Sequence, residues 1–267
     1  MSTADGAGSC VGCSCCFGLL IDITGSDVHR LARGLALDPR SFVTQCPSDE
    51  TDDDIGFSLE PGGETFTLVL RQRSAAHSRE LIVEHGRPCT FLLGPIQGTT
   101  RCGVYGLRPR ACRSYPAEIL HGEVSLRGIA RCPVSTALTG AGWRPDVREE
   151  QIEGDLHRVV VWRWNRHVLM ALDRCRFDDY LGYLVDVHDR LAPIWASLTT
   201  RPDWPTLRES WGICLDDGNS AFLSAPGALP ALGEITGELR DCVATIESAF
   251  PDEPTWATGL PNGEPRR

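Results

Sequence analysis

The sequence predicts a mainly α-helical protein with one small β hairpin, in which a loop-rich, cysteine-bearing N-terminal half packs on a C-terminal helical bundle. Nine of the twelve cysteines lie between Cys10 and Cys132, in a stretch rich in turn-forming residues. After residue 146, apolar residues recur at intervals of three and four, which is the period of an amphipathic helix. Boundaries are therefore expected at 1–145 for a cysteine-cluster domain, 146–250 for a helical domain and 251–267 for a disordered, Pro/Gly-rich tail.

The first predicted helix covers "TGSDVHRLARGLAL", from Thr24 to Leu37. Thr24 or Ser26 can cap its N-terminus, and Asp38-Pro39 marks its end. The apolar residues at helical spacing are Val28, Leu31 and Leu35. This segment is expected to pack one face on the core.

A β hairpin is predicted next, with "TFTLVLRQR" after Gly62-Gly63 as one strand and Ile55 to Leu59 as its partner. The acidic run between these elements, Asp49 to Asp54, reads as a solvated loop. It lacks the glycine and the distant glutamate of a calcium-binding loop.

Three helices are predicted in the second half, at 147–172, 177–198 and 232–249. In the second of these, Pro193 is expected to kink or end the helix. The apolar positions that define the first are Ile152, Leu156, Val159, Val160, Trp164, Val168 and Leu169. Helices of this length with short connections favour a bundle.

Composition restricts the function. The chain has 267 residues, 42% hydrophobic and 23% charged, so it can bury a core without disulfides. Its net charge of −10 argues against non-specific binding to nucleic acid, and it has no apolar run of the roughly 20 residues that span a membrane. The N-terminus "MSTADGAGSC" has no secretory signal pattern, so we expect a cytoplasmic protein with reduced thiols. Cysteines in such a compartment indicate metal binding.

The cysteines form two blocks. "CVGCSCC" places four thiols in seven residues, and four more follow at wider spacing. The eight are Cys10, Cys13, Cys15, Cys16, Cys89, Cys102, Cys112 and Cys132. Eight thiols fill two tetrahedral four-cysteine sites, or one iron–sulfur cluster and one further ion. Cys46 is a ninth candidate, whereas Cys175, Cys214 and Cys242 are expected to be ordinary buried cysteines.

The combination of "CVGCSCC", "CTFL" and "CGVYGLRPRACRSYP" resembles the YkgJ-like cysteine-cluster proteins and, more distantly, the flagellin lysine N-methylases. The resemblance covers Cys10 to Pro133 and implies that the thiolates chelate zinc or iron, with a 4Fe-4S cluster slightly preferred over zinc. It implies Cys10, Cys13, Cys16, Cys89, Cys102, Cys112 and Cys132 as ligands. Cys15 joins them less closely, because the single residue Ser14 separates it from Cys13 where the family pattern has two.

Residues between the predicted ligands can support the centre. Arg108 and Arg113 flank Cys112 and can offset the negative charge of several thiolates. Tyr105 follows Cys102 by three residues and can donate a hydrogen bond to a sulfur. These three side chains are predicted to surround the metal without binding it.

The sequence contains no dinucleotide, P-loop, nucleophile-elbow or H-E-x-x-H motif, and its early cysteines do not match the C-x3-C-x2-C of radical enzymes. No general base or nucleophile stands out. The first hypothesis is a metal-binding protein with a structural or redox centre whose helical half docks an unknown protein or small-molecule partner. The alternatives are an iron–sulfur-dependent, methylase-like modification enzyme, and a metal storage or delivery protein.

Overall fold

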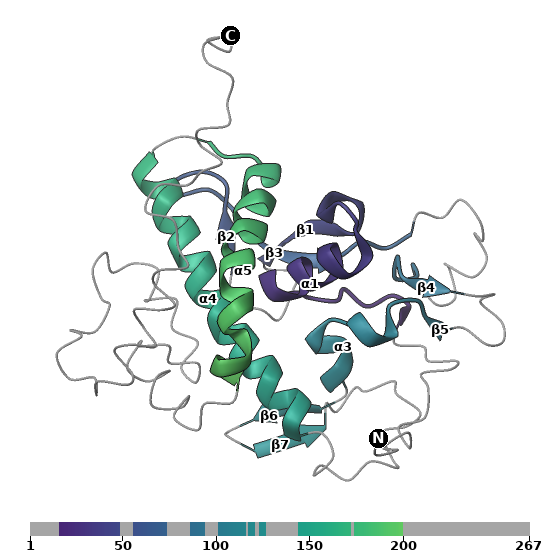
Figure 1. The fold of residues 1–267 in the computed structure, drawn as a ribbon. Coiled ribbons are helices and arrows are strands. Elements are labelled where there is room, and N and C mark those ends of the chain that lie inside the picture. The colour runs from purple at the N-terminus through teal and green to yellow at the C-terminus, as the bar shows by residue number, and fades with distance from the viewer. Residues whose placement is uncertain are drawn as a thin grey trace. The chain divides into compact units, whose positions relative to one another are not determined.

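A computed structural model describes residues 16–48, 56–73, 86–93, 101–115, 117–120, 123–126, 144–171 and 174–199 (Figure 1). About half of these residues are helical, and the strands are short and antiparallel. The predicted mixture of helices with a small sheet is confirmed at this level. Among the described helices, none is both long and apolar enough to cross a membrane.

The chain divides into two compact units. The cysteine unit consists of Met1–Asp53 and Thr67–Gly154, and the helical unit consists of Asp54–Phe66 and Asp155–Arg267. Strand β3 and helix α4 each contribute residues to both units. The two units are described separately below.

Helix α1 (Gly25–Leu35) confirms the first predicted helix, and Thr24 is its N-cap. The Thr24 hydroxyl accepts a hydrogen bond from the Asp27 N–H, and the Asp27 carboxylate accepts one from the Thr24 N–H. This capping box satisfies two backbone donors that a helix N-terminus otherwise leaves exposed. The helix ends at Ala36, which has left-handed geometry, before the short 3-10 helix Pro39–Ser41.

Three small sheets follow. Strands β1 (Val43–Pro47), β3 (Thr65–Leu70) and β2 (Phe57–Ser58) form the first, in the order β1-β3-β2. The predicted hairpin is confirmed, with Phe57 opposite Phe66. Strands β4 (Leu92–Leu93) and β5 (Arg101–Cys102) form the second, and β6 (Ala117–Leu120) and β7 (Glu123–Leu126) form the third. These two pairs are too short for a periodic sequence signal.

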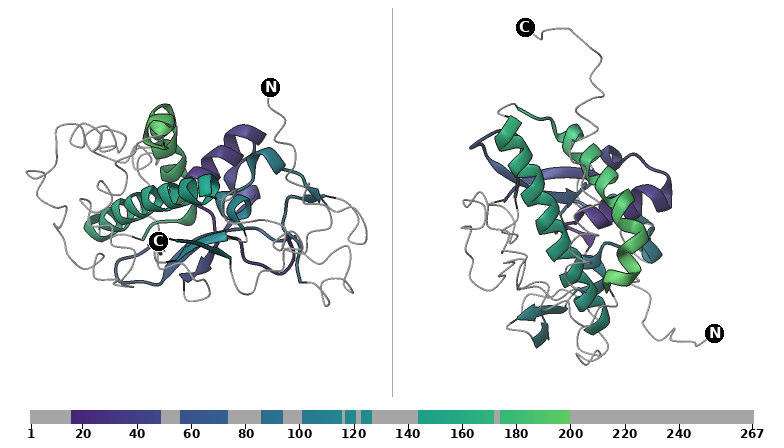
Figure 2. Two further views of the ribbon diagram at one scale, coloured as in Figure 1. Left: turned by 90° about the horizontal axis from the view of Figure 1, so that it is seen from below. Right: turned by 60° about the vertical axis from the view of Figure 1, so that its left-hand side comes forward.

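Helices α4 (Arg144–Ala171) and α5 (Phe177–Thr199) confirm two of the predicted helices. From Asp155 onward, α4 lies beside α5 in every view (Figures 1 and 2). The Tyr183 hydroxyl donates to the Val160 carbonyl oxygen across this pair, at 3.2 Å. The buried residues between the helices include Leu156, Val160, Trp164, Tyr180, Leu184 and Val187. They form the core of the helical unit.

Of the two effects expected of Pro193, a kink or an end, the end does not occur, because helix α5 continues through Pro193 to Thr199. A proline inside a helix costs about 3 kcal/mol, and the packing of the preceding residues Val187 and Leu191 outweighs that propensity. Leu169 was assigned to the apolar stripe but is exposed. The predicted helix at 232–249, the tail at 251–267 and the acidic run at 49–54 lie outside the described residues.

Candidate metal centre

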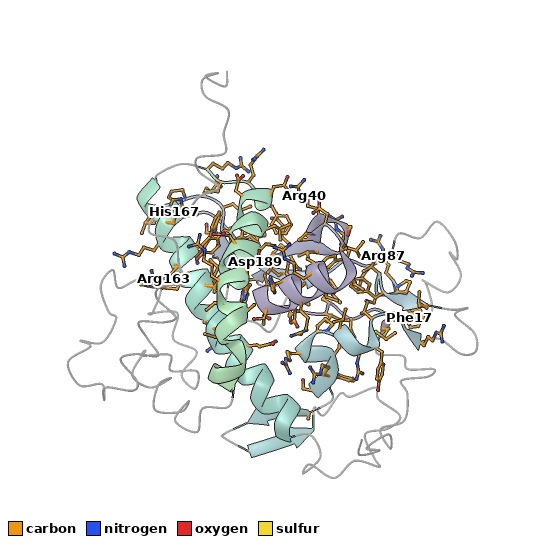
Figure 3. All side chains as sticks on the ribbon, viewed as in Figure 1. Phe17, Arg40, Arg87, Arg163, His167 and Asp189 are labelled. Atoms are coloured by element: carbon orange, nitrogen blue, oxygen red, sulfur yellow. The ribbon has the colours of Figure 1, made fainter. Side chains whose placement is uncertain are left out.

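Cys16 and Cys89 come from the two separate cysteine blocks and lie on adjacent antiparallel segments. Phe17 pairs with Pro88 in a β-bridge, and the register of this antiparallel bridge places Cys16 opposite Cys89. Figure 3 labels Phe17 and Arg87, which belong to these two segments. The Cys89 N–H donates to the Cys16 carbonyl oxygen at 2.8 Å, and the Gly18 N–H donates to the Arg87 carbonyl oxygen at 3.0 Å. Residues directly opposite in such a pair have Cβ atoms about 4.5–5.5 Å apart on one face. The backbones of Cys16 and Cys89 are therefore hydrogen-bonded neighbours.

A third segment borders this pair. Gln72 is bridged to Cys89, with the Arg73 N–H donating to Pro88 at 2.8 Å and the Thr90 N–H donating to Arg71 at 3.0 Å. Because Gln72 is the register partner of Cys89, it shares the face that carries the Cys89 side chain. Its side-chain amide donates to the Leu19 carbonyl oxygen at 3.1 Å. Sequence reasoning missed Gln72, because nothing in the sequence pairs it with either cysteine block.

Two glycines allow the segments to approach each other. Gly18 and Gly86 both have a positive φ, of 67° and 80°. A Cβ atom built on Gly86 would lie 2.6 Å from the Gly18 Cα, which is closer than real atoms come. The segment before Cys89 can therefore lie against the segment after Cys16 only if residue 86 has no side chain.

Cys102 and Cys112 occupy two further elements of the cysteine unit. Cys102 is the second residue of β5 and lies opposite Leu92, whose N–H donates to the Cys89 carbonyl oxygen at 3.1 Å. Cys112 lies in the short helix α3 (Arg110–Ser114). Cys102 and Cys112 are partly exposed, whereas Cys89 is buried. The hairpin β4–β5 therefore connects Cys102 to the segment that carries Cys89.

The other candidate ligands divide into two groups. Cys10, Cys13, Cys15 and Cys132 lie outside the described residues. Cys46 is buried on strand β1, and Cys175 belongs to the helical unit, where its N–H donates to the Leu59 carbonyl oxygen at 2.7 Å. No disulfide joins any two of the six described cysteines. Within the part of the chain that the structure describes, no three metal-ligating side chains come together.

The predicted supporting residues lie close together in the sequence, with Tyr105 and Arg108 before helix α3 and Arg113 in it. The Arg108 guanidinium stacks on the Tyr105 ring, 3.9 Å from its centroid, and its Nε donates to the Tyr105 carbonyl oxygen at 3.2 Å. This pair rigidifies the loop between Cys102 and Cys112, since a cation–π contact holds both side chains in one geometry. Tyr105 is exposed and Arg113, next to Cys112, is half-buried.

Positive charge dominates the segments that carry these cysteines. The described residues in 67–73, 86–93 and 101–115 include seven arginines and no acidic residue, although the whole chain has a net charge of −10. The chain contains no lysine, so every cationic side chain other than histidine is a guanidinium. Guanidinium groups suit the neutralisation of clustered negative charge, because each presents several donors in a fixed plane.

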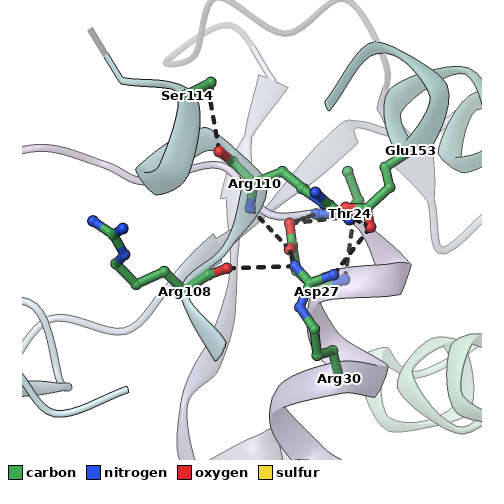
Figure 4. A network of polar contacts seen from close by, with 7 residues as sticks. All are labelled: Thr24, Asp27, Arg30, Arg108, Arg110, Ser114 and Glu153. Atoms are coloured by element: carbon green, nitrogen blue, oxygen red, sulfur yellow. Dashed lines mark hydrogen bonds and ion pairs between the residues drawn. The ribbon is translucent and has the colours of Figure 1, made fainter. Parts of the chain in front are cut away.

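A buried cluster of four charged side chains lies beside this region (Figure 4). The Glu153 carboxylate accepts a hydrogen bond from Arg30 at 3.0 Å and forms an ion pair with the Arg110 Nε at 2.9 Å, and Arg30 also pairs with Asp27. Three of the four side chains are less than a tenth exposed, and Arg30 is a quarter exposed. Two acids and two arginines give the cluster no net charge when all four are ionised.

Burial controls the electrostatics of the cluster. Burial and the nearby Asp27 carboxylate raise the pKa of Glu153 to about 7, although Arg30 and Arg110 oppose the shift. Burial lowers the pKa of Arg30, but Asp27 and Glu153 outweigh it and leave that pKa above its ordinary value. The Glu153 Oε2 atom is buried and has no hydrogen-bond partner among the described residues. Sequence reasoning missed this cluster; the one available signal was an acidic residue at 153 beside the apolar positions 152 and 156.

The sequence matches no protein-family model and no curated protein, and the fold matches no solved structure.

Proposed function

We propose that the protein holds an iron–sulfur cluster or a zinc ion through cysteine thiolates of the cysteine unit, and that this centre is structural or carries electrons. The observation that carries the proposal is the register of Cys16 and Cys89. These residues are 73 positions apart in the sequence (89 minus 16), yet they lie opposite each other on neighbouring segments. Packing alone gives no reason to bring two reactive thiols together in a chain of this size.

The donor set suits thiophilic metals. Two sulfur ligands of a tetrahedral zinc ion, each about 2.3 Å from the metal, are about 3.8 Å apart. Cβ atoms about 5 Å apart on one face can place their sulfurs at that separation without moving the backbone. Cys16, Cys89, Cys102 and Cys112 would supply described ligands, and Cys10, Cys13, Cys15 and Cys132 are proposed as the others. We favour iron–sulfur over zinc, as the resemblance to the YkgJ-like proteins implies.

Charge supports the same proposal. Four thiolates around a divalent ion carry a net charge of −2, and the arginines of the surrounding segments other than Arg110, which pairs with Glu153, can balance it. When bound, the centre would supply either a cross-link between the segments or a one-electron carrier. The pairing of the segments would orient the cysteines, and it is compatible with both a structural and an electron-carrying role.

The test is metal and acid-labile sulfide content of anaerobically purified protein, for the native sequence and for Cys89→Ser and Cys175→Ser. The proposal predicts iron with sulfide, or zinc without sulfide, in the native protein. Cys89→Ser should lose metal and Cys175→Ser should retain it. Equal metal content in both variants, or none in the native protein, would refute the proposal.

The alternative hypotheses have their own readouts. A methylase-like enzyme must bind S-adenosylmethionine, and such binding would raise the melting temperature of the metal-loaded protein. A storage or delivery protein would release its metal to a competing chelator within seconds to minutes, whereas a structural centre would retain it. We predict no thermal shift with S-adenosylmethionine and slow metal release.

A further inference from the structure

The loop that leads to Cys112 contacts one face of helix α1 at three successive points. Leu107 lies against Gly34, since a Cβ atom on Gly34 would be 2.6 Å from the Leu107 Cδ1. One turn earlier, an Arg30 Nη2 approaches the Arg108 carbonyl oxygen at 3.5 Å. Positions 27, 30 and 34 are three and four residues apart, so they share one face of the helix.

The third contact is the strongest. The Arg110 N–H is the first backbone donor of α3 and donates to the Asp27 Oδ1 at 3.1 Å, in a buried environment. Helix α3 has no side-chain cap of its own, because its N-cap is Pro109. The other oxygen of Asp27 accepts from the Thr24 N–H in the capping box of α1. One carboxylate therefore caps two helices, and Cys112 lies two residues after the second cap.

Glu153 contacts both arginines of the cluster, Arg30 and Arg110. Its Oε1 accepts a hydrogen bond from Arg30 and forms an ion pair with the Arg110 Nε at 2.9 Å, so the side chain and the backbone of Arg110 are held by two different carboxylates. The Ser114 hydroxyl donates to the Arg110 carbonyl oxygen at 3.2 Å and closes the helical turn around Cys112. In Figure 4, by contrast, the Arg108 guanidinium points away from the cluster.

We propose that Asp27 and Glu153 are positioning residues for the Cys112 thiolate, acting on it through the backbone and side chain of Arg110. This inference rests on the proposed metal centre. A carboxylate that fixes a ligand's backbone reduces the freedom that the ligand loses on binding metal, so the metal is held more tightly. With both acids ionised the cluster carries no net charge, so the charge of the thiolates is left to other arginines such as Arg108 and Arg113.

The test is the rate at which iodoacetamide alkylates each cysteine of the metal-loaded protein, followed by peptide mass spectrometry. In Asp27→Asn, an amide N–H faces either the Thr24 N–H or the Arg110 N–H, so one of the two helices loses its cap. We expect alkylation of Cys112 to rise roughly tenfold, in line with the effect of residues that orient metal ligands, and that of Cys89 to change much less. Glu153→Gln should act in the same direction.

Asp38→Asn is the matched control. Asp38 also accepts from a backbone N–H, that of Arg40 at 3.0 Å, and pairs with the Arg40 side chain, but it is exposed and caps the 3-10 helix Pro39–Ser41. This variant should leave every alkylation rate unchanged. The buried Cys46 reports on folding, because it reacts only when the cysteine unit opens.

The outcomes separate the two proposals. If a chelator changes the alkylation of neither Cys89 nor Cys112 in the native protein, the metal centre itself is refuted. If it raises the alkylation of Cys89 but not that of Cys112, Cys112 is not a ligand and the positioning inference is overturned. If the chelator raises the alkylation of Cys112 but Asp27→Asn and Glu153→Gln do not, only the positioning inference is overturned. An equal rise at Cys46 and Cys112 in both variants also overturns it, because the cluster then stabilises the whole unit and has no specific effect on Cys112.

Discussion

The two units bury polar groups in different ways. In the helical unit, polar atoms of aromatic side chains bond to the backbone inside an apolar core: the Trp164 Nε1 donates to the Ser58 carbonyl oxygen at 2.7 Å. Aromatic rings surround it, with Phe57 and Tyr180 stacked 4.0 Å apart and Trp164 5.0 Å from Tyr180. The cysteine unit instead buries two acids against two arginines, in the cluster of Figure 4.

This difference indicates where each unit obtains its stability. Burial of large aromatic side chains stabilises a fold directly, at roughly 25 cal/mol per Å² of apolar surface removed from water. A buried ionic cluster fixes geometry but adds little net stability, because the cost of removing charges from water offsets their attraction. The segments around the thiols consist of two-residue strands and a five-residue helix, which cannot be stable by themselves. We therefore expect the helical unit to be stable without metal and the cysteine unit to depend on it.

The largest expected effect is that of metal removal. Structural zinc contributes about 10–16 kcal/mol of folding free energy in small metal-dependent domains. After chelation, the N–H groups of Gly18, Cys89 and Gly103, which hydrogen-bond between segments, should exchange with solvent at least about a hundredfold faster. The N–H groups of residues 177–191 should not change. An equal change in both units, measured by hydrogen exchange and mass spectrometry, would remove the distinction between them.

Truncation of the aromatic core tests whether the helical unit obtains its stability from this core and independently of metal. Trp164→Ala removes a fully buried ring and its bond to Ser58, and should lower the free energy of unfolding by about 3–5 kcal/mol. Trp162→Ala is the control, since Trp162 is only half-buried and stacks on Arg166, and it should cost less than about 1.5 kcal/mol. Urea unfolding followed by circular dichroism measures both. Metal content should remain native in each; loss of metal in Trp164→Ala would contradict the independence of the helical unit.

The two units should respond to pH in opposite directions. Burial, with a smaller contribution from Arg158, lowers the pKa of His157 in the helical unit to about 4, from 6.5. Between these values the unfolded chain binds a proton that the folded chain does not, so stability is lost as pH falls from 6.5 to 4. A shift of this size corresponds to about 3 kcal/mol at most. His157→Gln should remove most of this dependence.

For Glu153 in the cysteine unit, stability changes with pH in the opposite direction. Its pKa is raised from 4.5 to about 7, so the folded chain binds the extra proton between these values. Stability is then lost as pH rises from 4.5 to 7, by a similar amount of about 3 kcal/mol at most. Glu153→Gln should flatten this profile. Hydrogen exchange at pH 5 and pH 7.5 measures the stability of each unit separately. If the stability of both units changes in the same direction with pH, burial does not shift the pKa of one of the two groups, His157 or Glu153, in the direction given above.

The smallest expected effect comes from a pair of glycines. In Gly86→Ala, the new residue would have a positive φ and a Cβ atom 2.6 Å from the Gly18 Cα. This variant should lower the free energy of unfolding by about 2 kcal/mol or more and should reduce metal content. Gly62→Ala has a similar φ of 68° but no atom within 4 Å, and should cost about 1 kcal/mol with metal content unchanged. Thermal unfolding and metal analysis check both. Equal effects would show that the close approach of the two segments does not matter to the centre.

Local patterns in the sequence predicted much of the fold. The capping residue Thr24, the hairpin after Gly63 and the two long helices each follow from signals within one segment. The buried partners of charged residues do not, because Asp27, Arg110 and Glu153 come from three separate elements and meet only in the folded chain. The stripe that included Leu169 fails for a related reason: periodicity shows which residues share a face, but not how far along the helix that face stays covered.

For the candidate site, the sequence predicts which cysteines bind metal but does not show which of them pair in the fold. The pairing of Cys16 with Cys89 depends on a bridge at Phe17 and Pro88 and on two glycines with positive φ. Isolated bridges have no periodic signal, so register of this kind cannot be read from a sequence. Gln72 lies opposite Cys89 through a second isolated bridge, so it could not be predicted either.

X-ray absorption at the iron and zinc K-edges of the purified protein tests the central claim most directly, because it identifies the atoms bound to the metal. A metal held by thiolates from both cysteine blocks predicts a first shell of sulfur at about 2.3 Å, with fewer protein-derived sulfurs in Cys16→Ser. A first shell of nitrogen or oxygen alone, or the absence of both edges from anaerobically prepared protein, would contradict it.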